Sequence, residues 1–345
     1  MFFFVIFFFF FSLVFCFAVH SLGFVFLLHA RLSYSFDEGG LDFLQRCQAL
    51  FVQGHVLQVR LELKRFGRIV HQFTKVATEL QVPLRAVLAL ERAIVLASTE
   101  DNQLTTVHAD YLQVCLLSHS YARAARYLSN FQVLKIGDMR ATGFSQSDYL
   151  RFWYYGGLVF TGMKDFGRAI EYYEACFSAP ATALSAPALE AFKKHVLVSL
   201  IHRGQSDPRR SAPGLLMRSL RTMATPYVEL STAFSTKDAA ALQLITQQYH
   251  EVFVRDNNWG LVCQCLESLA GRNIRGLTQT YMTMSLDALA KDAKMAGGRE
   301  EARKKLLRMV EQGSIVAHIN EKDGMVAFGE TENQLREREM VLFLL

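Results

Sequence analysis

Apolar residues recur about every 3.6 positions from Phe36 to Leu200, in runs that polar turn residues interrupt at short intervals. This period places the apolar side chains of each run on one face of a helix, so neighbouring helices must pack together to bury them. Alternation with the two-residue period of a β-strand is found only near the end, beyond Gly313. The pattern predicts a mainly α protein, and the presence of only six prolines agrees with it.

One predicted helix pair has the spacing of a tetratricopeptide repeat (TPR), in which large and small residues stand at fixed positions of two helices. Its signature residues are Trp153, Gly157, Phe160, Ala169, Tyr173 and Cys176. A weaker copy upstream has His108, Leu112, Cys115, Ala124 and Leu128 in the same roles. Because a single helix pair cannot bury its apolar face, we expect residues 36–204 to stack as a TPR-like solenoid with a concave surface for partners.

A loop is predicted to separate this solenoid from the helices that follow. Residues 205–214 contain two prolines and no apolar period. Basic residues gather around the loop, opposed only by Asp207: Lys193, Lys194, Arg203, Arg209, Arg210, Arg218 and Arg221. This composition favours a solvated basic linker, with a patch for nucleic acid or an acidic partner as the alternative.

Several further helices are predicted in residues 215–284. The first follows the capping residues Ser235 and Asp238. The next is expected to break near Gly271, and a third is expected from Ile274 to Met284. These helices lead directly into the last predicted module.

Residues 285–330 have the order of elements of a winged helix, that is, two helices followed by a β-hairpin. Ser285 is the predicted N-cap of the first helix, and the second runs from about Arg299 to Gly313, which supplies the positive φ of a helix C-terminus. The turn dipeptide Asp323-Gly324 then reverses the chain between two strands. The apolar face of the hairpin carries Ile315, Ala317, Ile319, Val326 and Phe328.

Two stretches of this region resemble the PCI domain family, whose members build the proteasome lid, the COP-nine signalosome and translation initiation factor three. The first comprises Arg255, Asp256, Asn257, Asn258, Gly260, Leu261, Val262, Gln264, Cys265 and Leu266. The second comprises Ile319, Asn320, Lys322, Asp323, Gly324, Met325, Val326 and Phe328. Within the PCI domain family, the chain most resembles the subunit-three family of the signalosome, over about residues 40–330.

The resemblance implies a non-catalytic scaffold that supports cullin deneddylation, and thereby regulation of cullin-RING ubiquitin ligases, in the cytoplasm and nucleus. The implied partners are other signalosome subunits, which would meet the edge of the winged-helix sheet and a C-terminal helical bundle. The candidate interface residues are Ile315, Val316, His318, Val326, Phe328 and Leu335. A subunit of the proteasome lid or of initiation factor three is the alternative within the PCI domain family.

Many winged helices bind DNA through a basic helix, so the charge of residues 285–330 bears on the choice of partner. The whole chain has a net charge of +5, but basic and acidic residues are equal in number across this segment. Phosphate binding requires a net positive face. The balance favours a protein partner, and a nucleic-acid-binding adaptor that uses Arg303, Lys304, Lys305 and Arg308 is the alternative from another class.

The sequence contains none of the catalytic or metal-binding motifs that we sought. The ten histidines form neither HxH nor HExxH, and neither a GxxxxGK[ST] phosphate loop nor a GxSxG elbow is present. The six cysteines form no CxxC pair, which suits a reducing compartment. We therefore expect no enzymatic activity, no cofactor, no metal ion and no small-molecule ligand.

The two ends depart from the rest of the chain. Residues 1–30 are phenylalanine-rich and carry no Asp, Glu, Lys or Arg, so they are apolar enough to cross a membrane, yet they lack the basic start of a secretory signal. We interpret this segment as an artefact of the gene model, a membrane anchor formed by residues 1–28, or a buried helix. Residues 331–345 are expected to be the start of a C-terminal helix, either truncated or in contact with a helical bundle.

Overall fold

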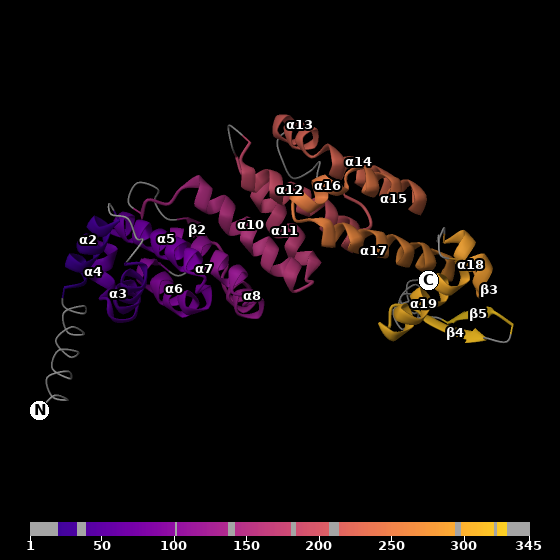
Figure 1. Ribbon diagram of the computed structural model, residues 1–345, viewed down its shortest axis with the longest axis horizontal. Helices are drawn as coiled ribbons and strands as arrows, with labels where there is room; N and C mark the ends of the chain where they lie inside the picture. The colour runs from indigo at the N-terminus through magenta and orange to yellow at the C-terminus, as the bar shows by residue number, and fades with distance from the viewer. Residues whose placement is uncertain are drawn as a thin grey trace, which may run out of the picture. The chain divides into compact units, whose positions relative to one another are not determined.

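The computed structural model describes residues 20–32, 39–100, 102–136, 142–180, 184–206, 214–293, 298–320 and 323–329. The chain divides into two compact units, Met1–Ala191 and Phe192–Leu345. Almost all of the secondary structure in the described residues is helical, and a small antiparallel sheet closes the second unit (Figure 1). The predicted fold class, helical repeats followed by a winged helix with a small hairpin, is therefore confirmed.

The first unit consists of helices that pack against their neighbours in the chain (Figure 1). They are α2 (Ser21–Arg31), α3 (Gly40–Gln53), α4 (Val56–Arg60), α5 (Leu63–Glu79), α6 (Pro83–Ala97), α7 (Thr106–Leu117), α8 (Tyr121–Asn130), α10 (Gln146–Gly162), α11 (Phe166–Ser178) and the first turns of α12 (Ala186–Arg203). Two short parallel strands pair with each other: β1 (Gln103–Leu104), between α6 and α7, and β2 (Lys135–Ile136), which follows α8. The sequence had indicated no strand in this region, and two residues are too few for a periodic signal.

Helices α10 and α11 form the predicted TPR-like pair. Tyr173 of α11 is fully buried and lies directly over Gly157 of α10, where an added Cβ would stand 2.5 Å from the ring. The neighbouring Gly156 faces Tyr172 in the same way, at 2.4 Å. The hydroxyl groups of Tyr173 and Thr161 are hydrogen-bonded at 2.9 Å, which fixes the ring. Glycine thus allows the large residues of one helix to pack against the backbone of the other.

The weaker copy is also a helix pair, formed by α7 and α8. Its five signature residues are buried: His108, Leu112, Cys115, Ala124 and Leu128. Burial lowers the pKa of His108 to about 4, so its imidazole is neutral at physiological pH and packs as an aromatic ring beside Phe131. The TPR-like spacing therefore identifies core positions in both pairs.

Helix packing in the first unit begins before residue 36, the start expected from the sequence. Val25 and Leu28 of α2 are buried, and α2 packs against α4 and α5. The apolar residues from Ser21 to Leu28 thus belong to the helical unit, whereas residues 1–19 lie outside the described part of the chain. No helix within the described residues is both long and apolar enough to cross a membrane.

The second unit consists of a helical part followed by a winged helix (Figure 1). The helical part contains the end of α12, α13 (Gly214–Met223), α14 (Thr225–Ser235), α15 (Ala239–Gln248), α16 (His250–Arg255) and α17 (Trp259–Thr278). The winged helix contains β3 (Thr283–Ser285), α18 (Leu286–Asp292), α19 (Gly298–Glu311), β4 (Val316–Asn320) and β5 (Met325–Gly329). Residues 207–213 of the predicted linker lie outside the described part of the chain.

Two expectations for the helical part were wrong. The chain does not break near Gly271, because α17 is one continuous helix with buried residues on both sides of the glycine: Val262, Cys265, Leu269 and Ile274. The expected third helix, from Ile274 to Met284, is instead the end of α17 followed by strand β3. The N-cap of α15 is Asp238, whose carboxylate accepts a hydrogen bond from the amide of Ala240 at 3.1 Å.

Lys193 and Lys194 do not belong to a solvated basic surface, contrary to the sequence interpretation. Both side chains are buried on α12, where Lys193 forms an ion pair of 2.8 Å with Asp256 and Lys194 donates to the amide oxygen of Asn258. The hydroxyl of Tyr227 donates to Asp256 at 3.0 Å and accepts from Asn258 at 2.8 Å. This buried polar network ties α12 and α14 to the turn between α16 and α17.

The network makes the second unit sensitive to acid. Burial opposes ionisation of Asp256, but the hydrogen bonds from Lys193 and Tyr227 and the charge of Lys193 outweigh it, so the pKa of Asp256 is lowered. The ionised carboxylate therefore stabilises the folded state above the ordinary pKa of about 3.9, and this contribution disappears as the pH falls through the lower folded-state pKa.

We expect the stability difference between the parent protein and Asp256→Asn to shrink as the pH is lowered from neutrality to below about 4. Urea unfolding of both proteins, followed by circular dichroism across this range, measures the difference. A difference that stays constant with pH would contradict the assignment of the shift to this network.

Candidate interaction surface of the winged helix

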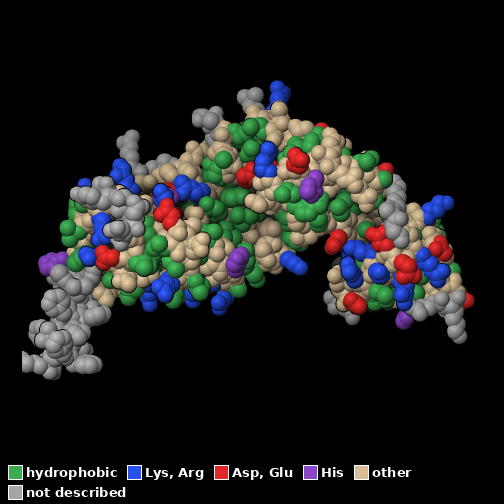
Figure 2. All heavy atoms as spheres, in the orientation of Figure 1, with side chains coloured by type: hydrophobic (Ala, Val, Ile, Leu, Met, Phe, Trp, Pro, Cys, Tyr) green, Lys and Arg blue, Asp and Glu red, His purple; other side chains and the backbone are tan. Residues whose placement is uncertain are grey.

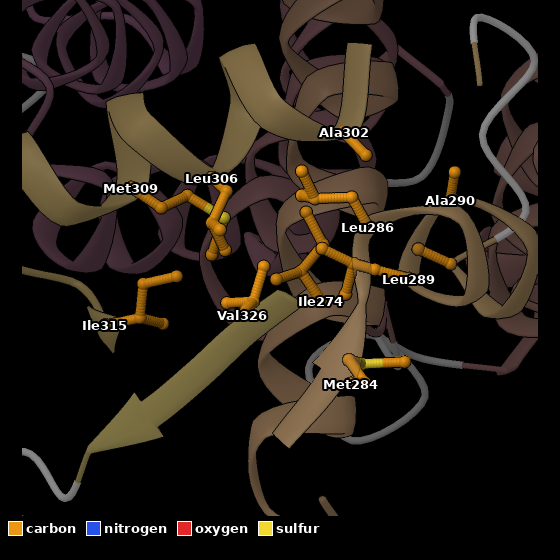
Figure 3. Packing of buried hydrophobic residues seen from close by; sticks show 11 residues of the cluster. Ile274, Met284, Leu286, Leu289, Ala290, Ala302, Leu306, Met309, Ile315 and Val326 are labelled. Atoms are coloured by element: carbon orange, nitrogen blue, oxygen red, sulfur yellow. The ribbon is translucent and has the colours of Figure 1, made fainter. Parts of the chain in front are cut away.

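The winged helix has a compact apolar core between two helices and one face of the sheet. Leu286 and Leu289 of α18 and Leu306 of α19 are almost fully buried and converge on Ile274 and Val326 (Figure 3). The hydroxyl of Ser285 accepts from the amide of Ala288 at 3.2 Å and starts α18 as predicted. Gly313 and Gly324 have φ values of 64° and 63°, as the helix end and the hairpin turn require.

The sheet has three strands in the order β3-β5-β4, one more than the predicted hairpin. Strand β5 lies in the middle and pairs antiparallel with both other strands. Its Ala327 stands opposite His318 of β4 on one side and opposite Thr283 of β3 on the other. Within the described residues, β4 pairs with β5 alone, so its other edge has backbone groups that can accept a further strand. This edge is the candidate interaction site.

The candidate interface residues separate into two faces. Ile315 and Val326 are 4% and 0% exposed and form part of the core, and Phe328 packs against that core. Val316 is 43% exposed, and His318 is also exposed on the opposite face. The alternation of buried and exposed positions agrees with the predicted pattern, so a partner that adds a strand at β4 would contact Val316 and His318 through their side chains. Leu335 lies outside the described residues.

Sequence reasoning did not single out Met325, an apolar side chain of this exposed face, or Met282, an exposed side chain beside the sheet. Met325 on β5 is 39% exposed, and Met282, just before β3, is 84% exposed. The amide of Phe328 donates to the carbonyl of Met282 at 2.8 Å, which holds this segment beside β5. Met325 stood in the strand alternation and could have been identified, whereas Met282 lay in a segment that the sequence pattern assigned to a helix.

The charge of the winged helix is mixed, in agreement with the sequence. Lys and Arg side chains lie among Asp and Glu over α18, α19 and the sheet in the visible face of Figure 2. In α19, Glu300, Glu301 and Glu311 stand beside the basic residues 303–305 and 308. A nucleic-acid surface would require a continuous positive face, so the surface is better suited to a protein.

The described residues offer no metal centre, and burial makes two of their thiols unreactive. No group of three or more His, Cys, Asp or Glu in this part of the chain could hold a metal ion. Burial raises the pKa of the Cys115 thiol to about 11 and that of Cys176 to about 12. Thiols with such pKa values stay protonated and are poor nucleophiles.

Helical repeats that lead through further helices into a winged helix with an open sheet edge define a PCI-type subunit. A PCI domain model matches residues 246–330, which include α17 and all strands and helices of the winged helix. A second family model, described as COP9 signalosome complex subunit 3, N-terminal helical repeats, matches residues 14–211. This match begins before residue 40, further upstream than the sequence resemblance had indicated.

The chain therefore belongs to the COP9 signalosome subunit 3 family, which confirms the resemblance. It is 35% identical over 319 residues to COP9 signalosome complex subunit 3 of Dictyostelium discoideum, covering 90% of this chain and 74% of the relative. It is 32% identical over 340 residues to the protein of the same description from Drosophila melanogaster, covering 94% of this chain and 76% of the relative.

Proposed function

We propose that this chain is a non-catalytic scaffold subunit of the COP9 signalosome, supporting cullin deneddylation and the regulation of cullin-RING ubiquitin ligases. The observation that carries the proposal is its membership of the subunit 3 family together with an edge of β4 that no other described strand pairs. Family membership favours the signalosome over the proteasome lid and initiation factor three. The mixed charge of the winged helix argues against a nucleic-acid-binding adaptor.

The proposed partners are other PCI subunits, which add a strand at the edge of β4. Such pairing gives affinity through main-chain hydrogen bonds and selectivity through the side chains that alternate along the strand. Val316 and His318 would contact the partner strand, and residues 331–345 would contribute to a helical bundle with sister subunits. The proposed location is the cytoplasm and nucleus, and attachment to a membrane through residues 1–28 is the alternative.

We expect Val316→Lys combined with His318→Lys to remove the other PCI subunits from the material that co-purifies with the tagged full chain. Lysines on an edge strand oppose pairing with another strand, and both positions are exposed, so unfolding should change by about 0.5 kcal/mol or less. Affinity purification followed by mass spectrometry, with thermal unfolding of the same variant, measures both effects.

The matched control is Leu307→Lys, which places a charge at another exposed apolar position, on helix α19 and not on a strand of the sheet. This control should retain all partners. If the parent protein itself purifies without PCI subunits, the assembly role fails. If the β4 variant retains them as the control does, the edge of β4 is not the contact.

A further inference from the structure

A basic pocket lies between the helical part of the second unit and helix α18, apart from the winged-helix sheet. Its volume is about 760 Å³, within the range of about 300–1,000 Å³ typical of ligand pockets. The end of α12, the turn between α14 and α15, the last turns of α17 and the end of α18 form its walls. Four cations line it, Arg203, Lys237, Arg272 and Arg275, together with a single carboxylate, Asp292.

Arg272 is held in a fixed position within this pocket. One of its terminal nitrogens donates to the carbonyls of Ile201 and His202, at 3.0 and 2.6 Å, and so caps the end of α12. Gly204, with a φ of 78°, leaves the space, since a Cβ there would stand 2.6 Å from the guanidinium. The Nε of Arg272 is buried and has no acceptor among the described residues. A donor is thus fixed in place and still unsatisfied.

The walls are also held together by a polar side chain. The Nδ2 of Asn273 donates to the carbonyl of Lys237 at 3.5 Å and to the carbonyl of Ala293 at 3.2 Å. These bonds join the turn after α14 and the residue after α18 to α17. The pocket is therefore a built feature of the helices, shaped before any ligand arrives.

The described residues do not neutralise the cations of the pocket. None of the four forms an ion pair with a carboxylate of the described residues, and Asp292 forms none with them. Burial, and after it the positive charge of Arg275, lower the pKa of Arg272, so the like charges oppose one another. An anionic ligand would relieve this repulsion.

We infer that this pocket binds an acidic segment of a partner protein, with two or more carboxylates facing its cations. Asp292 decides between an acidic peptide and a phosphate compound. A fully ionised phosphate group offers only acceptors and would be repelled by Asp292, whereas the backbone N–H groups of a peptide can donate to it. The inference does not depend on the edge of β4, so its failure would leave the proposed scaffold role intact.

The test measures binding of a fluorescein-labelled peptide, in which glutamate alternates with leucine and glycine, to the full chain by fluorescence anisotropy at low salt. The peptide with glutamine in place of glutamate should not bind. Lys237→Glu combined with Arg275→Glu should weaken binding of the glutamate peptide at least about tenfold, since both cations face the ligand. Both residues are exposed, so thermal unfolding should be unchanged.

The matched control is Arg218→Glu combined with Arg299→Glu, which changes the net charge equally at exposed positions that do not line the pocket. Binding by this control should stay within about twofold of the parent, because exposed charges outside the pocket are screened by solvent and salt. An equal loss in the control, or no binding by the parent, would overturn the inference. Tighter binding of tripolyphosphate that depends on Lys237 and Arg275 would also overturn it, in favour of a phosphate ligand.

Discussion

Asp256→Ala is expected to destabilise the second unit by about 3 kcal/mol, because it removes one member of a buried ion pair. The side chains of Lys193 and Asp256 are 10% and 9% exposed, so the lysine would keep its charge in a poorly solvated site without the carboxylate of Asp256. Tyr227 would lose an acceptor in the same change. Since the free energy of unfolding of a domain is about 5–15 kcal/mol, a loss of this size should be evident in urea unfolding.

Two further variants distinguish the loss of the buried ion pair from a general effect of removing a nearby charge. Arg255→Ala removes a neighbouring charge that is 76% exposed, and we expect a change of about 0.5 kcal/mol or less. Adding Lys193→Met to Asp256→Ala should recover part of the lost stability, because the buried charge that had faced the Asp256 carboxylate is gone. If Asp256→Ala unfolds at the urea concentration of the parent, the network does not stabilise the second unit.

Gly157→Val is expected to destabilise the first unit by about 3 kcal/mol through overpacking. Even the Cβ of this side chain would stand 2.5 Å from the ring of Tyr173, which is fully buried and hydrogen-bonded to Thr161. The ring therefore cannot move aside without a shift of α11 relative to α10. Thermal unfolding followed by circular dichroism measures the loss.

Gly23→Ala is the matched control, because Gly23 lies in helix α2 and an added Cβ meets nothing within 4 Å. This change should stabilise the protein by up to about 1 kcal/mol, the difference in helix propensity between the two residues. Gly157→Val combined with Tyr173→Leu should cost less than the sum of the two single changes, because the smaller side chain makes room. Additive effects would contradict a direct contact.

The parts of the fold that depend on local spacing could be predicted from the sequence. The contact of Gly157 with Tyr173 follows from a fixed offset between two adjacent helices, and the winged helix follows from one cap at Ser285 and a glycine at each later turn. The exposed positions Val316 and His318 follow from strand alternation. In each case the signal lies within one pair of adjacent elements.

The features that the sequence did not predict depend on contacts between distant segments. Gly271 costs a helix about 1 kcal/mol, but tertiary packing of the apolar residues on both sides of it outweighs this local penalty. Strand β3 has three residues, too few for an alternation to be recognised, and exists because β5 pairs with it. Lys193 and Lys194 read as surface charges because their partners stand more than sixty positions further along the chain.

The same distance explains why the basic pocket was only partly foreseen. Arg203 was noted as part of a basic cluster near the linker, but Lys237, Arg272 and Arg275 come from two other elements. A local count of charges cannot tell a cation that meets a carboxylate from one that lines a pocket. In the described residues of the cluster, Lys193 pairs with Asp256, whereas Arg203 lines the pocket without an ion pair to a described carboxylate.

An unpaired edge strand also ties the amount of a protein to the supply of its neighbours. If the proposed contact at β4 is not made, Val316 and the edge that no described strand pairs stay open to any other extended segment, including the β4 of a second copy. Under the proposed function, production in excess of partner subunits would therefore favour self-pairing, aggregation and removal by quality control. The proposed contact would thus link the stoichiometry of the assembly to the survival of its individual subunits.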